Sequence, residues 1–257
     1  FQSSCYGLSP KEGLPAREFV GTLPAQRGLT LLIADMLLVQ FGGASLYVLA
    51  ALAYLLYLAL PNPRVAQFAT GSLLFGVIGH IACFLIRAVG DTLPLTSTSV
   101  ALSIVALAVA LVWLVAQYYT GAIVLGAFVA PVAAVFAVLA SAAGTHTPLA
   151  PSATPFGLLG LHLGSVTLGT GLLALAAGGG VVYLIQERLL KRKKVGALFR
   201  RLPALDVLDR VVHRSQTAGF VLLTIAFVTG AVMAAAVGQV HMFHSNPEVV
   251  AIMILWG

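Results

Sequence analysis

The chain has 257 residues, of which 60% are hydrophobic and only 9% are charged, with a formal net charge of +6. A soluble domain carries roughly 25% charged residues, so this inventory excludes an ordinary water-facing surface and indicates a polytopic membrane protein in a lipid bilayer. The positive charge does not indicate nucleic-acid binding. Nine of the fourteen Lys and Arg residues lie between Arg188 and Arg214, in one connection that lacks the interleaved aromatic residues of a base-stacking surface.

Runs of apolar residues predict the membrane-spanning helices, because a helix needs about 20 such residues to cross a bilayer. Six complete spans are expected, at roughly 37–60, 65–90, 97–118, 121–142, 157–185 and 217–238. A seventh begins after Asn246-Pro247 and is cut off at Gly257, so we expect the natural protein to continue, to eight spans. Residues 1–28 are expected to be a flexible or tag-derived lead-in, and residues 29–257 a single transmembrane helical domain. The predicted fold class is therefore all-α, a bundle of transmembrane helices.

The basic connection at 186–214 predicts the orientation of the bundle, because Lys and Arg are enriched in cytoplasmic loops. We expect this connection on the cytoplasmic side of a bacterial inner membrane. Its apolar residues recur at intervals of three and four, which predicts one or two short interfacial helices broken near Pro203. These residues are Leu198, Leu202, Leu205, Leu208 and Val212. The connection either packs under the bundle or docks a partner, and the candidate docking residues are Arg192, Lys193, Arg200 and Arg201.

Two histidines, His80 and His162, fall inside predicted spans. At a rise of 1.5 Å per residue they lie about 14 Å and about 9 Å below the outer ends of their helices. Ionisable groups at such depth are rare and are functional candidates. Three roles are open: axial ligation of haem iron, proton relay, and hydrogen bonding between helices. Carboxylates for a relay are scarce in the spans, whereas haem requires only two imidazoles. Cys83, three residues after His80, could add a ligand to a metal site, but a lone cysteine is more often a small buried hydrophobic residue.

Small residues surround both histidines, as a flat porphyrin would require. Gly76 lies four residues before His80, and Ser165 and Gly169 lie three and seven residues after His162. Plain helix packing is an equally good interpretation, since Gly160 and Gly164 also bracket His162 in a small-xxx-small pattern. Arg87, seven residues after His80, is a candidate partner for a haem propionate, and snorkelling to the interface is its alternative role.

The loops expected on the outer side contain His146, His241 and His244. We include His146 and His244 among the candidate cofactor-binding residues, with solvated polar side chains as the alternative. No nucleophile–base pair and no acid pair stand out in the sequence, so we expect a binding protein rather than an enzyme; if the histidines ligate iron, it would handle haem b non-covalently. Because neutral imidazole is required for ligation, haem occupancy is expected to fall at acid pH.

The run LHLGSVTLGTGLLALAAGGGVVYLIQERLLKRKK, which starts at Leu161, is followed by RRLPALDVLDRVVHRSQTAGFVLLT. Together these motifs resemble the cytochrome c assembly family, which includes CcsA, HemX and YpjD. The match covers about 157–235 well and extends more loosely around His80. By resemblance, His162 is the spanning histidine of the family, and the family implies contact with haem.

Departures from the CcsA pattern favour the HemX/YpjD branch. The tryptophan-rich loop that presents haem in CcsA has no counterpart in 143–156, and Asp91 and Thr92 stand where a histidine is expected. The resemblance then implies haem transport or sensing, and for HemX the control of glutamyl-tRNA reductase, an enzyme of haem biosynthesis. Such an enzyme or a cytochrome c assembly partner would dock on the basic connection. A homodimer and a transporter or proton channel remain open alternatives.

Overall fold

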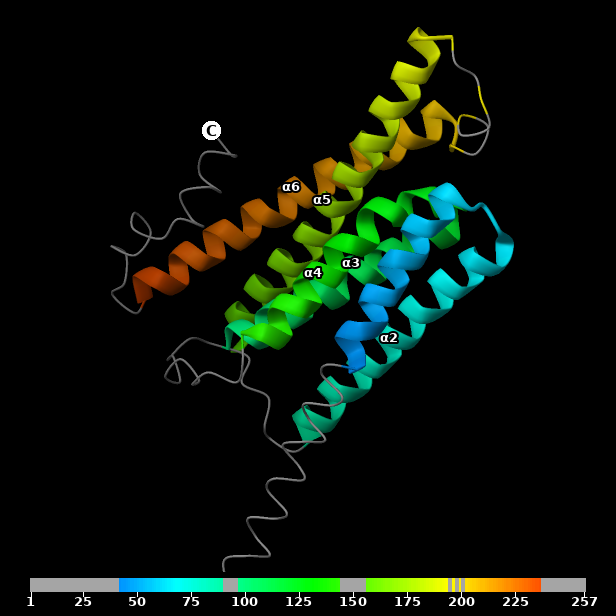
Figure 1. Cartoon of the computed structure of the whole chain (residues 1–257). Helices are drawn as coiled ribbons and strands as arrows, with labels where there is room; N and C mark the ends of the chain where they lie inside the picture. The colour runs from blue at the N-terminus through cyan, green and yellow to red at the C-terminus, as the bar shows by residue number, and fades with distance from the viewer. Residues whose placement is uncertain are drawn as a thin grey trace, which may run out of the picture. The chain divides into compact units, whose positions relative to one another are not determined.

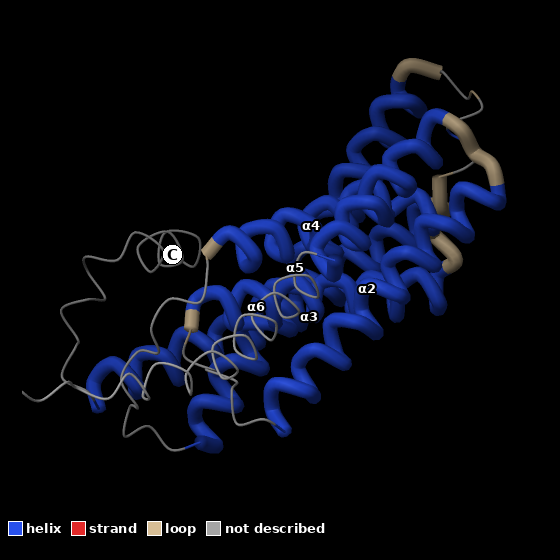
Figure 2. The backbone as a smooth tube through the Cα atoms, turned by 60° about the horizontal axis from the view of Figure 1, so that its bottom comes forward, coloured by secondary structure: helices blue, strands red, loops and turns tan. Residues whose placement is uncertain are grey.

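The helices of the protein are seen in a computed structural model that describes residues 42–89, 97–143, 156–193 and 202–236, with Gly196 and Phe199 between the last two ranges. All of these residues belong to one unit, Val39–Gly257. The described part is helical throughout and contains no strand (Figure 2). Predicted residues outside these ranges, including His146, His241, His244 and the start of a seventh span, therefore lie outside the described part.

Six helices in the described part are long and apolar enough to cross a membrane, as the sequence predicted. The first is Gly42–Ala59, and it is followed by α2 (Pro63–Val89), α3 (Thr98–Thr120), α4 (Gly126–Ala142), α5 (Phe156–Lys191) and α6 (Leu205–Ala236). A short 3-10 helix, Ile123–Leu125, leads into α4. Successive helices run in opposite directions (Figure 1), so the connections at 60–62 and 121–125, the end of α5 and the start of α6 lie at one end of the unit. We call this end the basic end.

Local chemistry sets the helix boundaries. Pro63 opens α2, and the side-chain carbonyl of Asn62 accepts a hydrogen bond from the backbone N–H of Arg64 at 2.9 Å. The hydroxyl of Ser97 accepts from the N–H of Val100 and begins α3. Gly121 ends α3 with a φ of 63°, a left-handed conformation that favours glycine. Proline, cap residues and glycine thus mark the breaks that separate the spans.

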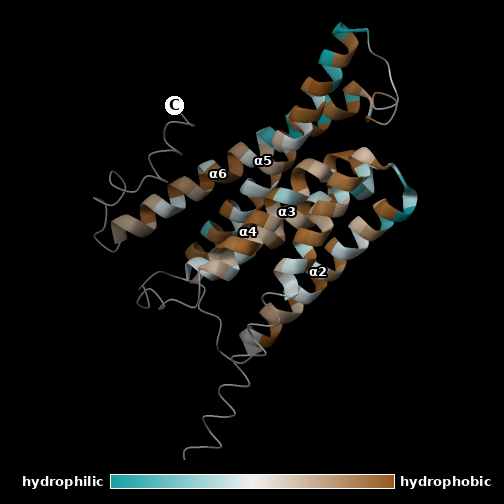
Figure 3. Ribbon diagram, in the orientation of Figure 1, coloured by the Kyte–Doolittle hydropathy of each residue, from teal (hydrophilic) through white to brown (hydrophobic). Residues whose placement is uncertain are grey.

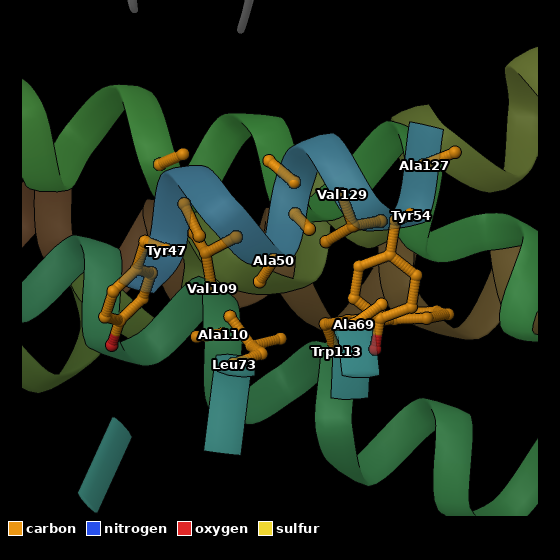
Figure 4. Close-up of a cluster of buried hydrophobic side chains, with 14 of the residues drawn as sticks. Tyr47, Ala50, Tyr54, Ala69, Leu73, Val109, Ala110, Trp113, Ala127 and Val129 are labelled. Carbon is orange, nitrogen blue, oxygen red and sulfur yellow. The ribbon is translucent and has the colours of Figure 1, made fainter. Parts of the chain in front are cut away.

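The core of the unit combines small residues with a few large aromatic ones. Tyr47 and Tyr54 of the first helix are fully buried, and they lie beside Leu73 of α2 and Trp113 of α3 (Figure 4). Large apolar side chains such as Phe75 lie on the outer faces of the helices, where a lipid bilayer would cover them. The apolar exterior and the hydrogen-bonded helices are what a bilayer requires of a spanning chain.

The last two helices are longer than predicted. The helix α5 continues six residues beyond 185, to Lys191, and α6 begins at Leu205 instead of 217. The sequence prediction located helices by runs of apolar residues, so it did not include the polar ends of these two helices. Of the residues predicted to form separate interfacial helices, Leu205, Leu208 and Val212 belong instead to the first turns of α6. The connection between the two helices is therefore 192–204 rather than 186–214.

Candidate functional site

His162 lies where α5 packs against α6. Its Nδ1 is 3.0 Å from the carbonyl oxygen of Ala226 and 3.2 Å from the hydroxyl oxygen of Thr229. The ring lies over Gly230, because a Cβ added to this glycine would be 3.0 Å from Cε1 of the imidazole. The hydroxyl of Thr229 is in turn held by the backbone one turn earlier, at 2.8 Å from the carbonyl of Ile225. Three residues of one helix face thus fix the position of the imidazole.

These contacts determine the tautomer of His162. A carbonyl oxygen can only accept, so the hydrogen bond to Ala226 requires the proton on Nδ1. The lone pair is then on Nε2, which has no hydrogen-bond partner among the described residues. An imidazole whose Nδ1–H is bonded to a backbone carbonyl is the usual arrangement of a histidine that ligates a metal through Nε2.

His80 has different surroundings, and both of its ring nitrogens are engaged. Its Nδ1 is 3.2 Å from the hydroxyl of Tyr47, and its Nε2 is 2.7 Å from the hydroxyl of Ser103. The ring also stacks on Phe84, with the centroids 5.1 Å apart. His80 of α2 is therefore linked to the first helix and to α3, and one of these two hydrogen bonds would have to break before a nitrogen could ligate a metal.

The contacts of the two histidines share no residue. His80 is bound by Tyr47 and Ser103, whereas His162 is bound by α6. Among the helices, α5 packs mainly on α6 and α3, and α2 packs on α3. The structure thus places the two histidines among different residues. A single haem held by both of them stays a prediction.

Two of the glycines near the histidines, Gly76 and Gly169, serve helix packing. The ring of Tyr47 lies against Gly76, where an added Cβ would be 3.2 Å from the ring. Gly169 and Gly219 face each other across α5 and α6, and an added Cβ on Gly169 would be 3.2 Å from the carbonyl oxygen of Gly219. By contrast, Gly160 and Gly164 have open space around them, and they do not form the predicted small-residue seam.

The remaining predicted site residues are placed only in part. The backbone of Arg87 belongs to α2, and its side chain lies outside the described part, as do Arg200 and Arg201. Arg192 and Lys193 are exposed in the turn that follows α5. Within the described ranges, no three His, Cys, Asp or Glu residues gather as a metal site, and Cys83 is a free thiol.

Sequence reasoning missed the hydroxyl partners of His80 and a second polar group in the core. The hydroxyl of Tyr54 donates to the side-chain carbonyl of Gln117 at 2.6 Å, and Thr70 lies 3.1 Å from Tyr54 and 2.8 Å from the amide nitrogen of Gln117. These groups join the first helix, α2 and α3 a few turns from His80. The available signal was a hydroxyl or amide inside an apolar span, since such groups must find partners there.

Comparison with protein families gives a match that covers most of the chain. The family described as Cytochrome C assembly protein matches residues 44–256, which include both spanning histidines and the basic connection. The searches of curated proteins and of solved structures gave no match. With six described helices that are long and apolar enough to cross a membrane, and a family match over more than half of its length, the chain belongs to the cytochrome c assembly protein family.

Proposed function

We propose that this protein binds haem b non-covalently and handles it, by transport or by sensing, with Nε2 of His162 as a ligand of the iron. The observation that carries the proposal is the hydrogen bond from Nδ1 of His162 to the carbonyl of Ala226. This bond fixes the tautomer in which Nε2 carries the lone pair. Membership in the cytochrome c assembly family supports the choice of haem over another metal.

The residues around His162 fit this role. The Ala226 carbonyl and the Thr229 hydroxyl lie within hydrogen-bond distance of Nδ1 and orient the imidazole, which leaves Nε2 for the iron. Gly230 gives the ring the space it occupies. When bound, haem would supply a Lewis-acidic iron, which His162 would hold through Nε2.

His80 enters the proposal as the second ligand. For this role it must release either Tyr47 or Ser103, whose hydroxyls engage its two nitrogens. Arg87, seven residues further along α2, enters the proposal as a partner for a propionate. The two histidines therefore differ in what ligation requires. His162 can bind iron through Nε2 with its hydrogen bonds intact, whereas His80 must first lose one hydrogen bond.

The absorption spectrum tests this proposal. The full chain is purified, titrated with haem, and compared with His162→Ala and His80→Ala. A Soret band that is lost in His162→Ala supports the proposal. A band that only shifts in His80→Ala indicates that His80 is the second ligand, and an unchanged band indicates that it is structural. No band in the parent after reconstitution, or an unchanged band in His162→Ala, would contradict haem ligation by His162.

A second candidate function is that of a HemX-like regulator in the bacterial inner membrane, with the basic end in the cytoplasm. The observation that favours it is the length of α5. Its 36 residues extend about 54 Å, which exceeds the roughly 30 Å hydrocarbon core of a bilayer. The polar residues of α5 and α6 gather at the basic end (Figure 3), and Arg192 and Lys193 are exposed there. In this function the projecting helices dock a haem-biosynthesis enzyme such as glutamyl-tRNA reductase.

A further inference from the structure

A second polar site lies at the basic end, where the last turn of α3 meets the first turns of α6. A cavity of about 310 Å³ there is lined by Tyr119, Thr120, Val207, Arg210, Val211 and Arg214. Arg210 and Arg214 are four residues apart, so their side chains leave the same face of α6. None of these residues belongs to the histidine sites or to the docking residues on the connection.

The charge of this cavity is only partly neutralised. Arg210 forms an ion pair with Asp206 at 3.0 Å, and both side chains are more than half exposed. Exposed ion pairs of this kind contribute little to stability, so Arg210 can leave Asp206 for another anion at little cost. Arg214 has no ion-pair partner in the described ranges. The cavity therefore offers one free guanidinium and a second that is held weakly.

The position of the cavity corresponds to the headgroup level of a bilayer. Arg214 is followed by Ser215, Gln216 and Thr217, after which α6 contains no charged residue up to its end at Ala236 and is apolar apart from two threonines. Tyr118 and Tyr119, at the end of α3, are 84% and 80% exposed. Tyrosine and arginine side chains are typical of the boundary between hydrocarbon and water. The cavity thus combines two guanidinium groups, a phenol and two valines at this boundary.

We propose that this cavity binds the phosphate group of an anionic phospholipid. Guanidinium groups bind phosphate oxygens through paired hydrogen bonds, which is why arginine predominates at phosphate sites. The apolar wall of Val207 and Val211 favours a lipid over a free phosphate ion, because the glycerol and upper acyl carbons of a lipid would cover it. The hydroxyl of Thr120 already donates to the carbonyl of Ala116 at 2.7 Å, so the arginines are the principal donors.

Native mass spectrometry of the full chain in detergent tests this proposal. The protein is titrated with phosphatidylglycerol or with phosphatidylcholine, and the affinity for the first bound lipid is compared. We expect phosphatidylglycerol to bind more tightly than phosphatidylcholine. In the double variant Arg210→Gln with Arg214→Gln, the affinity for phosphatidylglycerol should fall about 25-fold, or about fivefold for each arginine. Arg188→Gln with Lys191→Gln removes the same charge from exposed residues of α5 outside the cavity, and it should change the affinity less than twofold.

The other outcomes overturn the proposal. An equal loss in both double variants would mean that the basic end attracts anionic lipid only as a diffuse charge. Equal affinity for the two lipids would exclude an anionic headgroup, and displacement of phosphatidylglycerol by millimolar inorganic phosphate would assign the cavity to a free phosphate ion. If the double variant does not fold, Arg214→Gln alone can be measured, because it leaves the Arg210–Asp206 pair in place. Its affinity for phosphatidylglycerol should still fall about fivefold.

Discussion

The imidazole of His162 on α5 lies directly over Gly230 on α6. A Cβ on Gly230 would be 3.0 Å from Cε1 and 3.4 Å from Nδ1 of the ring, which is closer than side-chain atoms normally approach. Because the same ring donates to Ala226, one turn earlier on α6, the position of the imidazole depends on a glycine at 230. The orientation of the proposed ligand is therefore determined by two helices and not by its own helix alone.

Gly230→Ala is expected to move the His162 ring and weaken the hydrogen bond to Ala226. We expect weaker haem binding in a Soret titration and a stability lower by about 1–3 kcal/mol, the usual effect of overpacking. Gly164→Ala is the matched control on α5, because nothing lies within 4 Å of an added Cβ there. An unchanged titration in Gly230→Ala would contradict the role of this contact in orienting the ligand.

Gly126→Ala is expected to destabilise the bundle. An added Cβ would lie 2.8 Å from the indole ring of Trp113 and closer still to the ring of Tyr54. Both aromatic side chains are fully buried and cannot move without disturbing their neighbours. We expect a clear fall in Tm in detergent, corresponding to about 1–3 kcal/mol.

The control for this substitution is Gly180→Ala, where the added Cβ meets open space. Both substitutions replace a glycine by the same residue, so they differ mainly in the contact with the aromatic rings. Equal Tm values for the two variants would show that Gly126 is not packed against Tyr54 and Trp113.

Tyr47→Phe is expected to remove one hydrogen bond of His80 and leave the ring that covers Gly76 in place. Interhelical hydrogen bonds in membrane proteins contribute about 0.6 kcal/mol on average and at most about 1.7 kcal/mol, so the loss of stability should fall in this range. The substitution also frees Nδ1 of His80, and haem binding should persist or strengthen if His80 is the second ligand. Weaker haem binding without loss of stability would contradict this account.

Charge reversal of Arg192 and Lys193 to Glu tests the docking role of the basic end. A purified glutamyl-tRNA reductase should be captured by the parent chain in a haem-dependent way, and capture should be lost in the variant. The spectrum of haem bound at His162 should not change, since both residues lie in the turn after α5. Capture that is equal with and without the two charges would contradict docking through these residues.

The sequence by itself determined the class of the protein and the number of described spans. An apolar run is recognised one residue at a time, and proline, glycine and cap residues such as Pro63 and Gly121 mark the breaks. It did not determine where α6 begins, because the polar turns that start at Leu205 are helical without being apolar. The sequence also identified His80 and His162 as functional candidates, because ionisable side chains are rare within membrane spans.

Only the tertiary structure decided what those histidines contact. His80 meets Tyr47 and Ser103, which are 33 and 23 residues away, and His162 meets Ala226, 64 residues away. Helical periodicity specifies which face of its own helix a residue occupies, but the partner depends on which helices pack and at what rotation. For this reason the sequence predicted two equivalent ligands. The structure distinguishes an imidazole whose Nε2 has no partner among the described residues from one whose nitrogens are both engaged.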